Sequence, residues 1–390
     1  MTYDSIIAGA GFAGAVTARV LAEAGRRVLV LEQRPHVGGN AFDCLDESGI
    51  LIHQYGPHIF HTNDKTVFDF LSRFTAWRTY EHEVVANLPA ENGRMELPVP
   101  FNLASLRLAF GPERSAQLQE KLISAYGAGT KVTILQLREA TAPALSDLAQ
   151  YVYDHIFVRY TMKQWGQTPE EIDPAVTARV PVFLSEDCRY FQDTYQGMPL
   201  HGYTALFENM LRHDNIDLRL NTDAREHLRF ENGTILLDGA EFTGDVIYSG
   251  PADELFGCCF GRLPYRTLDF KFETFPADVV QSHGTVNYTM DEDYTRITEF
   301  KHLTGQVRPG VTTTVKEYSR AYTGADGEIP YYAIANADTA ALYAKYAEKA
   351  AQFPRLHLLG RLAEYRYYNM DAIVAGALAL SRKLIGESAC

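Results

Sequence analysis

A glycine-rich turn that follows a short buried strand is the feature that most constrains the fold of this chain. The run Tyr3–Ile7 reads as a strand and leads into Gly9, Gly11 and Gly14, which have the spacing G-x-G-x-x-G. The first glycine permits the tight turn, the second lets the backbone approach a pyrophosphate, and the third lets the next helix pack on the strand. That helix is expected over residues 13–24, with its N-terminal amides directed at the phosphates. The pattern therefore predicts a dinucleotide-binding unit.

The residues after this unit distinguish between the two common dinucleotides. A second strand, Arg27–Leu31, ends at Glu32, eighteen positions after Gly14 (32 minus 14), where a carboxylate can accept a hydrogen bond from a ribose hydroxyl. The chain then reaches the pair Gly38-Gly39 instead of a third nucleotide-binding strand. A Gly-Gly pair at this distance resembles the FAD-binding signature shared by amine oxidases, GDP-dissociation inhibitors and sugar-nucleotide mutases, because glycines let a backbone pass close to the cofactor. We therefore expect FAD rather than NAD.

Composition limits the class of protein. The chain has 390 residues, 46% of them hydrophobic, which is enough for two to three domains with substantial cores. No run approaches the roughly 18 apolar residues of a membrane span, and a strand that begins at Tyr3 leaves no room for a signal peptide, so we expect a cytoplasmic protein. Five cysteines without a paired C-x-x-C pattern predict neither a disulfide framework nor a metal site. The formal charge of −13 argues against nucleic acid as a partner and makes anion binding dependent on a few local arginines.

The order of segments predicts an α/β protein with a Rossmann-like FAD-binding domain, a helical insertion and an antiparallel β-sheet domain. Helical periodicity dominates from Asn102 to about Tyr160, and β-branched or aromatic residues alternate with polar ones from Leu268 to Lys316. The expected boundaries are 1–83, 199–262 and 350–390 for the discontinuous FAD-binding domain, 98–168 for the helical domain with a mobile loop to about 179, and 84–97, 180–198 and 263–349 for the sheet domain.

Four longer motifs occur together, and in this order, in one protein family. They are the segments 160–166 (YTMKQWG), 179–181 (RVP), 189–197 (RYFQDTYQG) and 361–368 (RLAEYRYY). With the glycine fingerprint and the segment 56–61 (GPHIFH), they make the chain similar to bacterial UDP-galactopyranose mutases essentially from end to end. These motifs are far more specific than the glycine loop alone.

The resemblance implies a flavoenzyme that catalyses no net redox reaction and interconverts UDP-galactopyranose and UDP-galactofuranose. In that family reduced FAD (FADH−) is the nucleophile: N5 of the flavin attacks the anomeric carbon, UDP leaves, and a covalent flavin-sugar adduct lets the sugar ring open and close again. The resemblance further implies inhibition by UDP, an external reductant, and a homodimer or higher homo-oligomer.

The same resemblance assigns roles to individual residues. Arg179 and Arg296 are the candidate catalytic residues, because forked guanidinium groups suit the oxygens of the pyrophosphate that carries the developing charge. The candidate substrate contacts, which include an aromatic pair beside the uridine and tyrosines that donate to phosphate, are Arg179, Arg296, Tyr160, Trp165, Tyr190, Asn287, Tyr332, Tyr367 and Asn369. The candidate cofactor contacts are Gly9, Gly11, Phe12, Gly14, Glu32, Gln33, Gly39, Asn40, His58, Ile59, His61, Gly360, Arg361, Tyr368, Asn369 and Met370.

One residue departs from the family pattern. Many members have aspartate directly after the Tyr-Tyr pair, whereas this chain has Asn369. An amide can keep a hydrogen bond to the sugar but cannot accept a proton. No general acid or base is therefore assigned.

The segment from about Trp165 to Arg179 is expected to be a lid that closes when UDP binds. Gly166, Pro169 and Pro174 break regular structure within it. Closure would bring Arg179 onto the pyrophosphate and keep water away from the reacting sugar.

Two other classes share the glycine fingerprint. An amine-oxidase-like FAD oxidoreductase would need an apolar cage for its amine, whereas arginines and tyrosines suit a diphosphate better. A non-catalytic binding module similar to GDP-dissociation inhibitors would keep the fingerprint without a flavin. The absorption spectrum of the purified protein separates the binding module from a flavoenzyme. Turnover of UDP-galactofuranose with and without dithionite separates the oxidoreductase from a mutase.

Overall fold

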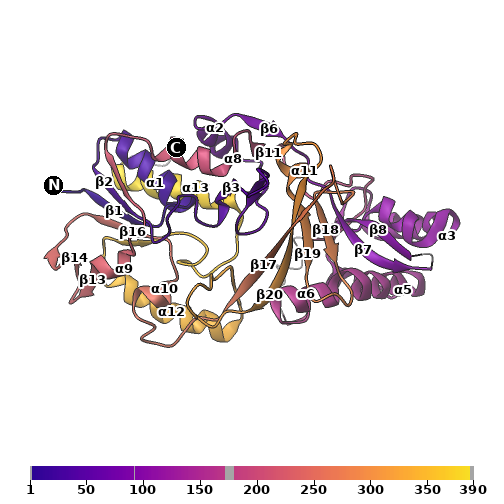
Figure 1. Cartoon of the computed structure of the whole chain (residues 1–390). Helices are drawn as coiled ribbons and strands as arrows, with labels where there is room; N and C mark the ends of the chain where they lie inside the picture. The colour runs from indigo at the N-terminus through magenta and orange to yellow at the C-terminus, as the bar shows by residue number, and fades with distance from the viewer. Residues whose placement is uncertain (1, 92, 172–179, 387–390) are drawn as a thin grey trace.

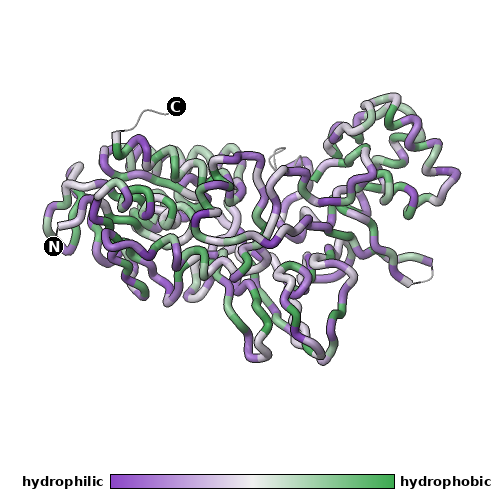
Figure 2. Tube along the Cα trace, turned by 90° about the horizontal axis from the view of Figure 1, so that it is seen from above, coloured by the Kyte–Doolittle hydropathy of each residue, from purple (hydrophilic) through white to green (hydrophobic). Residues whose placement is uncertain are grey.

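The computed structural model describes residues 2–91, 93–171 and 180–386, and it confirms the predicted fold class. Figure 1 shows a parallel sheet with its helices at one end of the molecule, a large sheet in the middle and a group of helices at the other end. The molecule is also elongated when seen from above, with hydrophobic and hydrophilic positions interleaved along the chain (Figure 2). The large middle sheet therefore connects the two ends.

The parallel sheet is the Rossmann-like unit. Its strands run in the order β12 (Ile216–Arg219), β2 (Val28–Leu31), β1 (Ser5–Ala8), β16 (Asp245–Tyr248) and β22 (Leu356–Leu358), with all neighbours parallel. The strands β2, β1 and β16 are buried along their whole length, as expected for a parallel sheet that is covered on both faces. Successive side chains alternate between the two cores, so Ile7 faces one and Ile6 the other.

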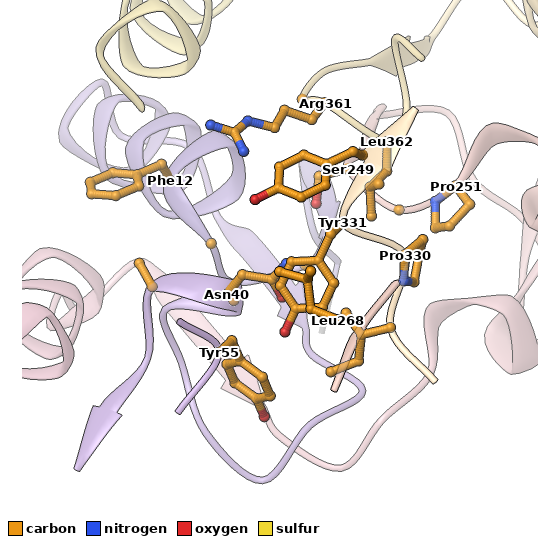
Figure 3. Close-up of a pocket in the computed structure, with 18 of the residues that line it drawn as sticks. Phe12, Asn40, Tyr55, Ser249, Pro251, Leu268, Pro330, Tyr331, Arg361 and Leu362 are labelled. Atoms are coloured by element: carbon orange, nitrogen blue, oxygen red, sulfur yellow. The ribbon is translucent and has the colours of Figure 1, made fainter. Parts of the chain in front are cut away.

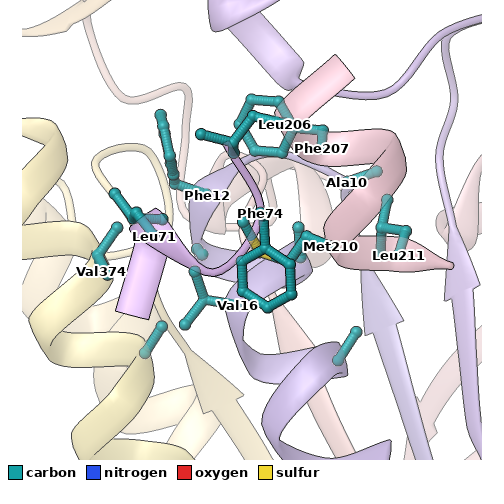
Figure 4. Close-up of a cluster of buried hydrophobic side chains, with 14 of the residues drawn as sticks. Ala10, Phe12, Val16, Leu71, Phe74, Leu206, Phe207, Met210, Leu211 and Val374 are labelled. Carbon is teal, nitrogen blue, oxygen red and sulfur yellow. The ribbon is translucent and has the colours of Figure 1, made fainter. Parts of the chain in front are cut away.

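Three helices cover one face of this sheet: α1 (Phe12–Glu23), α8 (Gly202–Leu211) and α13 (Met370–Ile385). Figure 4 shows the core between them, to which α2 (Lys65–Ser72) also contributes. The rings of Phe12 and Phe207 lie 4.7 Å apart in this core. Burial of each such side chain contributes about 2 kcal/mol. This core fixes α1 and α13 against each other.

The opposite face is covered by shorter elements and by one longer helix. They are α9 (Ala224–His227), β13 (Leu228–Glu231), β14 (Thr234–Leu237), α10 (Ala252–Leu255) and the end of α12 (Ala337–Ala351). The exposed strand β15 (Ala240–Glu241) pairs with β14. Near the sheet lie a 3-10 turn (Gly39–Ala41), the pair β3 (Asp43–Leu45) and β4 (Leu51–His53), and an antiparallel sheet in the order β5 (Phe60–Thr62), β11 (Tyr195–Pro199) and β6 (Trp77–Thr79).

The large middle sheet has seven strands. Their order is β21 (Tyr332–Ala333), β17 (Tyr265–Phe275), β20 (Thr312–Ala321), β19 (Arg296–Glu299), β18 (Thr285–Tyr288), β7 (Val84–Ala90) and β8 (Gly93–Val99). Neighbours are antiparallel except β18 and β7, which are parallel. The short helix α11 (Phe300–Thr304) follows β19.

The helical part packs against β7 and β8. It consists of α3 (Leu103–Tyr126), α4 (Ile134–Arg138), α5 (Pro143–Val152), a π-helix (Tyr153–Phe157) and α6 (Val158–Trp165). Asn102 begins α3 with a reciprocal capping box to Ser105. The predicted helical stretch 102–160 also contains a strand that periodicity did not indicate, β9 (Lys131–Val132), which pairs with β10 (Val182–Phe183). Two residues are too few to show an alternating pattern.

The predicted strand Tyr3–Ile7, helix 13–24 and strand Arg27–Leu31 are present as β1, α1 and β2, with ends shifted by at most two residues. Within 180–198, β10 pairs with β9 and β11 pairs with β5 and β6, so these described strands do not join the seven-stranded sheet. The domain boundaries themselves stay a prediction. In the described ranges, no helix is long and apolar enough to cross a membrane.

The first testable prediction concerns the contact between α1 and β1. A Cβ atom at Gly14 would lie 1.9 Å from the carbonyl oxygen of Gly9, so we expect Gly14→Ala to lower the free energy of unfolding by about 3 kcal/mol or more. Gly376→Ala in α13 is the control, because its Cβ would meet Leu359 Cδ1 at 3.4 Å and alanine favours a helix by about 1 kcal/mol. Urea unfolding of both variants checks this. Equal stabilities would contradict it.

Candidate active site

A cavity of about 1080 Å³ lies between the nucleotide-binding sheet and the seven-stranded sheet. One wall comes from the ends of β1, β2 and β16 and from the N-termini of α1 and α13; the other comes from β17, β18, β19, β21 and α6. Figure 3 shows part of the lining, with Phe12, Asn40 and Tyr55 on one side and Tyr331, Leu268 and Pro330 on the other. Segments from both ends of the chain therefore meet around one space.

The glycine fingerprint forms a cradle at the first wall. Gly9 has a φ of 105°, and a Cβ there would lie 2.2 Å from Ser249 Oγ. The backbones of Gly11 and Gly39 approach so closely that a Cβ at Gly39 would lie 3.2 Å from Gly11 Cα. The first turn of α1 has no side-chain cap and no acidic residue. Its amides are thus available to an anion, and this fits the pyrophosphate of FAD.

Charged groups beside the cradle also suit a dinucleotide. The carboxylate of Glu32 is 4% exposed and accepts from the backbone N–H groups of Ala10 at 2.7 Å and Arg34 at 2.9 Å. The guanidinium of Arg34 donates to Asn40 at 2.9 Å and lies over the ring of Tyr55, 4.5 Å from its centroid. Its other terminal nitrogen, Nη1, is buried with no hydrogen-bond partner among the described residues. An anionic group in the cavity would satisfy it.

A row of polar side chains crosses the second wall. Asn287 of β18 lies opposite Arg296 of β19, which in turn lies opposite Glu317 of β20, so all three point to one face of the sheet. Arg296 Nε donates to Glu317 Oε1 at 2.7 Å, and the Glu317 side chain is fully buried. Burial opposes the charge of Arg296, but Glu317 raises the pKa of the guanidinium well above its ordinary value. Arg296 is therefore a permanent cation at the cavity surface.

An aromatic group lies next to Arg296. Tyr160 of α6, Tyr332 of β21 and Tyr367 line the cavity, and Trp165 packs on the last two with ring centroids 5.1 and 5.7 Å apart. Burial raises the pKa of Tyr160 and Tyr332 above the ordinary tyrosine value, so both hydroxyls stay neutral donors. The ring of Tyr367 also lies 4.7 Å from the guanidinium carbon of Arg361. Flat rings and neutral donors suit a nucleotide base and its phosphates.

Three histidines lie at or directly behind the cavity wall, and two of them, His53 and His82, are buried. His58 and His82 line it, and burial lowers the pKa of each to about 3; His53 packs behind His58, and burial lowers its pKa to about 4. His58 Nδ1 lies 2.9 Å from the carbonyl oxygen of Gly56. Because a carbonyl only accepts, Nδ1 carries the proton and Nε2 is left as an acceptor. His61 differs, since its Nδ1 lies 2.7 Å from the Asp193 carboxylate.

Most of the sequence-predicted site residues lie in the cavity wall. The cofactor candidates found there are Gly9, Gly11, Phe12, Glu32, Gln33, Gly39, Asn40, His58, Ile59, His61, Gly360, Arg361, Asn369 and Met370, and the substrate candidates are Tyr160, Tyr190, Asn287, Arg296, Tyr332, Tyr367 and Asn369. Gly14, Trp165 and Tyr368 do not line it: Gly14 packs α1 on β1, Trp165 supports two lining tyrosines, and the Tyr368 carbonyl accepts from Arg361 at 2.6 Å. Arg179 and the second half of the expected lid lie outside the described residues.

Sequence reasoning missed several residues of the site. Arg34, Tyr55 and His82 line the cavity, and Glu317 and Arg266 support residues that do. Arg34 stands inside the segment that was recognised as cofactor-binding, so its charge was a usable signal. Glu317 and Arg266 lie in strands whose alternation shows only which face a residue takes. The partner of Glu317 becomes visible only in the sheet register, and the partners of Arg266 only in the packing of α6 on the sheet.

Comparison with known proteins identifies the family to which this chain belongs. The family model described as UDP-galactopyranose mutase matches residues 155–367, and the model for NAD(P)-binding Rossmann-like domains matches residues 7–74. The chain belongs to the UDP-galactopyranose mutase family. Among its relatives, the UDP-galactopyranose mutase of Mycoplasma pneumoniae is 37% identical over 388 residues, which cover 98% of this chain and 96% of the relative. The family resemblance expected from the motifs is thus confirmed.

Other members of the UDP-galactopyranose mutase family show its range. The dTDP-fucopyranose mutase of Escherichia coli is 36% identical over 383 residues, covering 97% of this chain and 98% of the relative. The crystal structure of a reduced UDP-galactopyranose mutase has the same fold, with a TM-score of 0.68 at 16% identity, covering 99% of this chain and 94% of that one. These matches favour the mutase family over the amine-oxidase-like and GDP-dissociation-inhibitor-like alternatives. The Rossmann-like match agrees with a dinucleotide site of the FAD type.

The second prediction follows from the buried histidines. Histidine in an unfolded chain has a pKa of about 6.5, so the unfolded state binds more protons than the folded state below that pH. We expect the free energy of unfolding to fall as the pH falls from 7 to 5, by up to about 1.4 kcal/mol per pH unit for each histidine. Urea unfolding at pH 7, 6 and 5 measures this slope.

A matched pair of variants isolates the contribution of one histidine. His53→Asn removes the titrating ring but can still accept from the backbone N–H of His58, which lies 3.0 Å from His53 Nδ1. The slope should flatten in this variant and stay unchanged in His201→Asn, because His201 is exposed. Identical slopes in His53→Asn and the wild type would contradict the assignment.

Proposed function

We propose that this protein interconverts UDP-galactopyranose and UDP-galactofuranose with FAD as its resident cofactor. The observation that carries the proposal is the continuity of one cavity, which joins a glycine cradle for a dinucleotide to a second wall centred on Arg296. A nucleotide sugar bound to Arg296 would therefore share the space with the cofactor. The full-length similarity to mutases supports this function.

Residues of the first wall would hold the cofactor. The uncapped N-terminus of α1 and the glycines at positions 9, 11 and 39 would take the pyrophosphate, and Glu32 would accept from the adenosine ribose. His58, Ile59, Arg361 and the N-terminus of α13 would lie at the flavin end. When bound in its reduced form, FAD supplies the nucleophile, N5, for attack on the anomeric carbon of the sugar.

The second wall would bind the substrate through its diphosphate. Arg296, held by Glu317, would keep a positive charge at the leaving pyrophosphate, while tyrosine hydroxyls add neutral donors. We also assign a phosphate contact to Arg179 from its motif. Tyr160 and Trp165 would hold the uridine, and Asn287 and Asn369 would face the sugar. Because the overall charge is −13, binding of the diphosphate depends on these few cations.

The remaining features of the proposal concern partners. UDP should bind the same wall and inhibit, an external reductant should reduce the flavin, and the protein should act in the cytoplasm as a homodimer or higher homo-oligomer. The E. coli relative acts by name on dTDP-fucopyranose, so assays should offer that sugar nucleotide beside UDP-galactopyranose.

The third prediction tests the redox requirement. The purified protein should carry FAD, and dithionite-reduced protein should convert UDP-galactofuranose to UDP-galactopyranose while oxidised protein is nearly inert. Chromatography of the sugar nucleotides and the flavin absorption spectrum measure both properties in one sample. Equal turnover by oxidised and reduced protein, or a colourless protein that binds no added FAD, would contradict the proposal.

The fourth prediction concerns Arg296. Truncation of a charge-assisted phosphate contact in a desolvated site costs about 2 to 5 kcal/mol, so we expect Arg296→Ala to lower kcat/KM by roughly 30-fold or more with FAD still bound. Arg296→Lys should rescue little, because lysine lacks the bidentate fork. Arg107→Ala is the control, since Arg107 pairs with Glu186 on the exposed surface of the helical part. Wild-type kcat/KM in Arg296→Ala would exclude the assigned role, and the same test applies to Arg179→Ala.

A further inference from the structure

The last turn of α6 is held by a buried arginine from the seven-stranded sheet. Arg266 of β17 is 9% exposed, and its Nε and Nη2 atoms donate to the carbonyl oxygens of Gln164 and Lys163, both at 3.1 Å. Ser319 of β20 donates to the same Gln164 carbonyl at 2.7 Å. A helix C-terminus carries partial negative charge, so a guanidinium group is favourably placed there. The residue that follows this turn, Gly166, has a φ of 71°, and a Cβ there would lie 3.0 Å from Arg266 Nη1.

Within the ranges that the structure describes, the charge of Arg266 is compensated by hydrogen bonds to carbonyl and hydroxyl oxygens and not by a carboxylate. Among the described residues, no carboxylate oxygen lies within 4 Å of its guanidinium nitrogens, and burial lowers its pKa. A buried cation is costly unless hydrogen bonds compensate it. The carbonyl oxygens of α6 and the hydroxyl of Ser319 supply that compensation. Arg266 and the end of α6 therefore stabilise each other.

The backbone of Arg266 also holds the strand that carries Tyr332. The Arg266 carbonyl oxygen accepts from the Tyr331 N–H at 2.9 Å, and Arg266 lies opposite Tyr332 in the pairing of β17 with β21. Trp165, at the end of α6, packs on Tyr332 with ring centroids 5.1 Å apart. Arg266 thus contacts both segments of this aromatic pair. Its side chain holds the end of α6, which carries Trp165, and its backbone pairs with β21, which carries Tyr332.

A second, half-buried cation, Lys163, connects α6 to the hairpin that carries Arg296. The ammonium group of Lys163 donates to the carbonyl oxygens of Tyr288, Glu292 and Tyr294, the last two at 3.0 and 3.1 Å. These residues lie at the connection between β18 and β19. All three ammonium protons are therefore used. Lys163 fixes α6 relative to the strands that present Asn287 and Arg296.

We propose that Arg266, together with Lys163, is a positioning residue for nucleotide binding. It sets the distance between the aromatic residues on α6 and Arg296, without contact with the substrate itself. This inference rests on the proposed function, because it needs α6 to bind the nucleotide half of the substrate. The groups that Arg266 positions, on α6 and on β21, are assigned to the nucleotide half of the substrate and not to the sugar. Loss of Arg266 should therefore weaken nucleotide binding more than it slows chemistry at the sugar.

Trp165 itself can report the experiment. The chain has two tryptophans, so Trp77→Phe leaves Trp165 as the single emitter. In that background, Arg266→Met removes the cation and Arg266→Lys keeps it without the fork. UDP binding is titrated by quenching of Trp165, FAD content is measured by absorption, and kcat and KM are measured with reduced enzyme.

Arg78→Met is a closely matched control. Arg78 of β6 donates to the Leu303 carbonyl in the last turn of α11 at 2.7 Å, and the glycine that follows, Gly305, has a φ of 69°. A Cβ at Gly305 would lie 2.2 Å from Arg78 Nε. The geometry repeats that of Arg266 and Gly166, but neither Arg78 nor any residue of α11 lines the described cavity. If Arg266 only stabilised the fold, Arg266→Met and Arg78→Met would change UDP binding to the same extent.

We expect both Arg266 variants to retain FAD, to raise the Kd for UDP and the KM for the sugar nucleotide about 10- to 100-fold, and to change kcat much less. Trp165 emission without ligand should also shift, and Arg78→Met should change none of these properties. If Arg266→Met loses FAD, Ser319→Ala, which removes one shared hydrogen bond, should still raise the Kd several-fold. Wild-type Kd and Trp165 emission in Arg266→Lys and Ser319→Ala would overturn the proposal.

The two proposals fail in different ways. If the wild type binds FAD but neither UDP nor a sugar nucleotide, the proposed function is wrong. In that case the emission of Trp165 without ligand still shows whether Arg266 positions α6, because this measurement needs no nucleotide.

Discussion

The site depends first on how closely the start of α1 approaches the end of β1. At Gly14 the helix backbone lies against the carbonyl of Gly9 with no room for a side chain. This contact directs the free amides of α1 into the cavity and leaves space for a second backbone, at Gly39, to pass in front of Gly11. A phosphate placed there would be held by fixed dipoles that need no reorganisation. The packing of α8 and α13 on α1 holds this geometry in place (Figure 4).

The second constraint is electrostatic. Under the proposed function, a protein with a formal charge of −13 binds a doubly charged diphosphate, so the position of its cations matters more than their number. Arg296 is paired with a fully buried carboxylate, while Arg266 and Lys163 are compensated by carbonyl oxygens. The first arrangement leaves part of a guanidinium open to the cavity. In the second arrangement the cations connect secondary-structure elements, because a carbonyl dipole orients the cation without neutralising its charge.

The sequence predicts the nucleotide-binding half of the molecule well. Gly9, Gly11, Gly14 and Glu32 act locally, within one strand-helix-strand unit, and local patterns carry that information. The family motifs also predicted residues such as Tyr160 and Arg296, which the fold brings to one cavity from distant segments. The charge partners were not predictable in this way. Glu317 and Ser319 are 21 and 155 positions from the residues they contact. The strand register brings Glu317 to Arg296, and the packing of α6 on β20 brings Ser319 to Gln164.

The order of the elements has a consequence for synthesis. The first strand and helix leave the ribosome early, but β22 and α13, which complete the sheet and cover α1, are the last described elements of the chain (Figure 1). Chains generally fold from the N-terminus during synthesis. The part of the apolar face of α1 that packs on α13 therefore stays uncovered until nearly the whole chain is made. The cavity wall is likewise complete only when the last described segment has been made, because Gly360, Arg361 and Met370 are part of it.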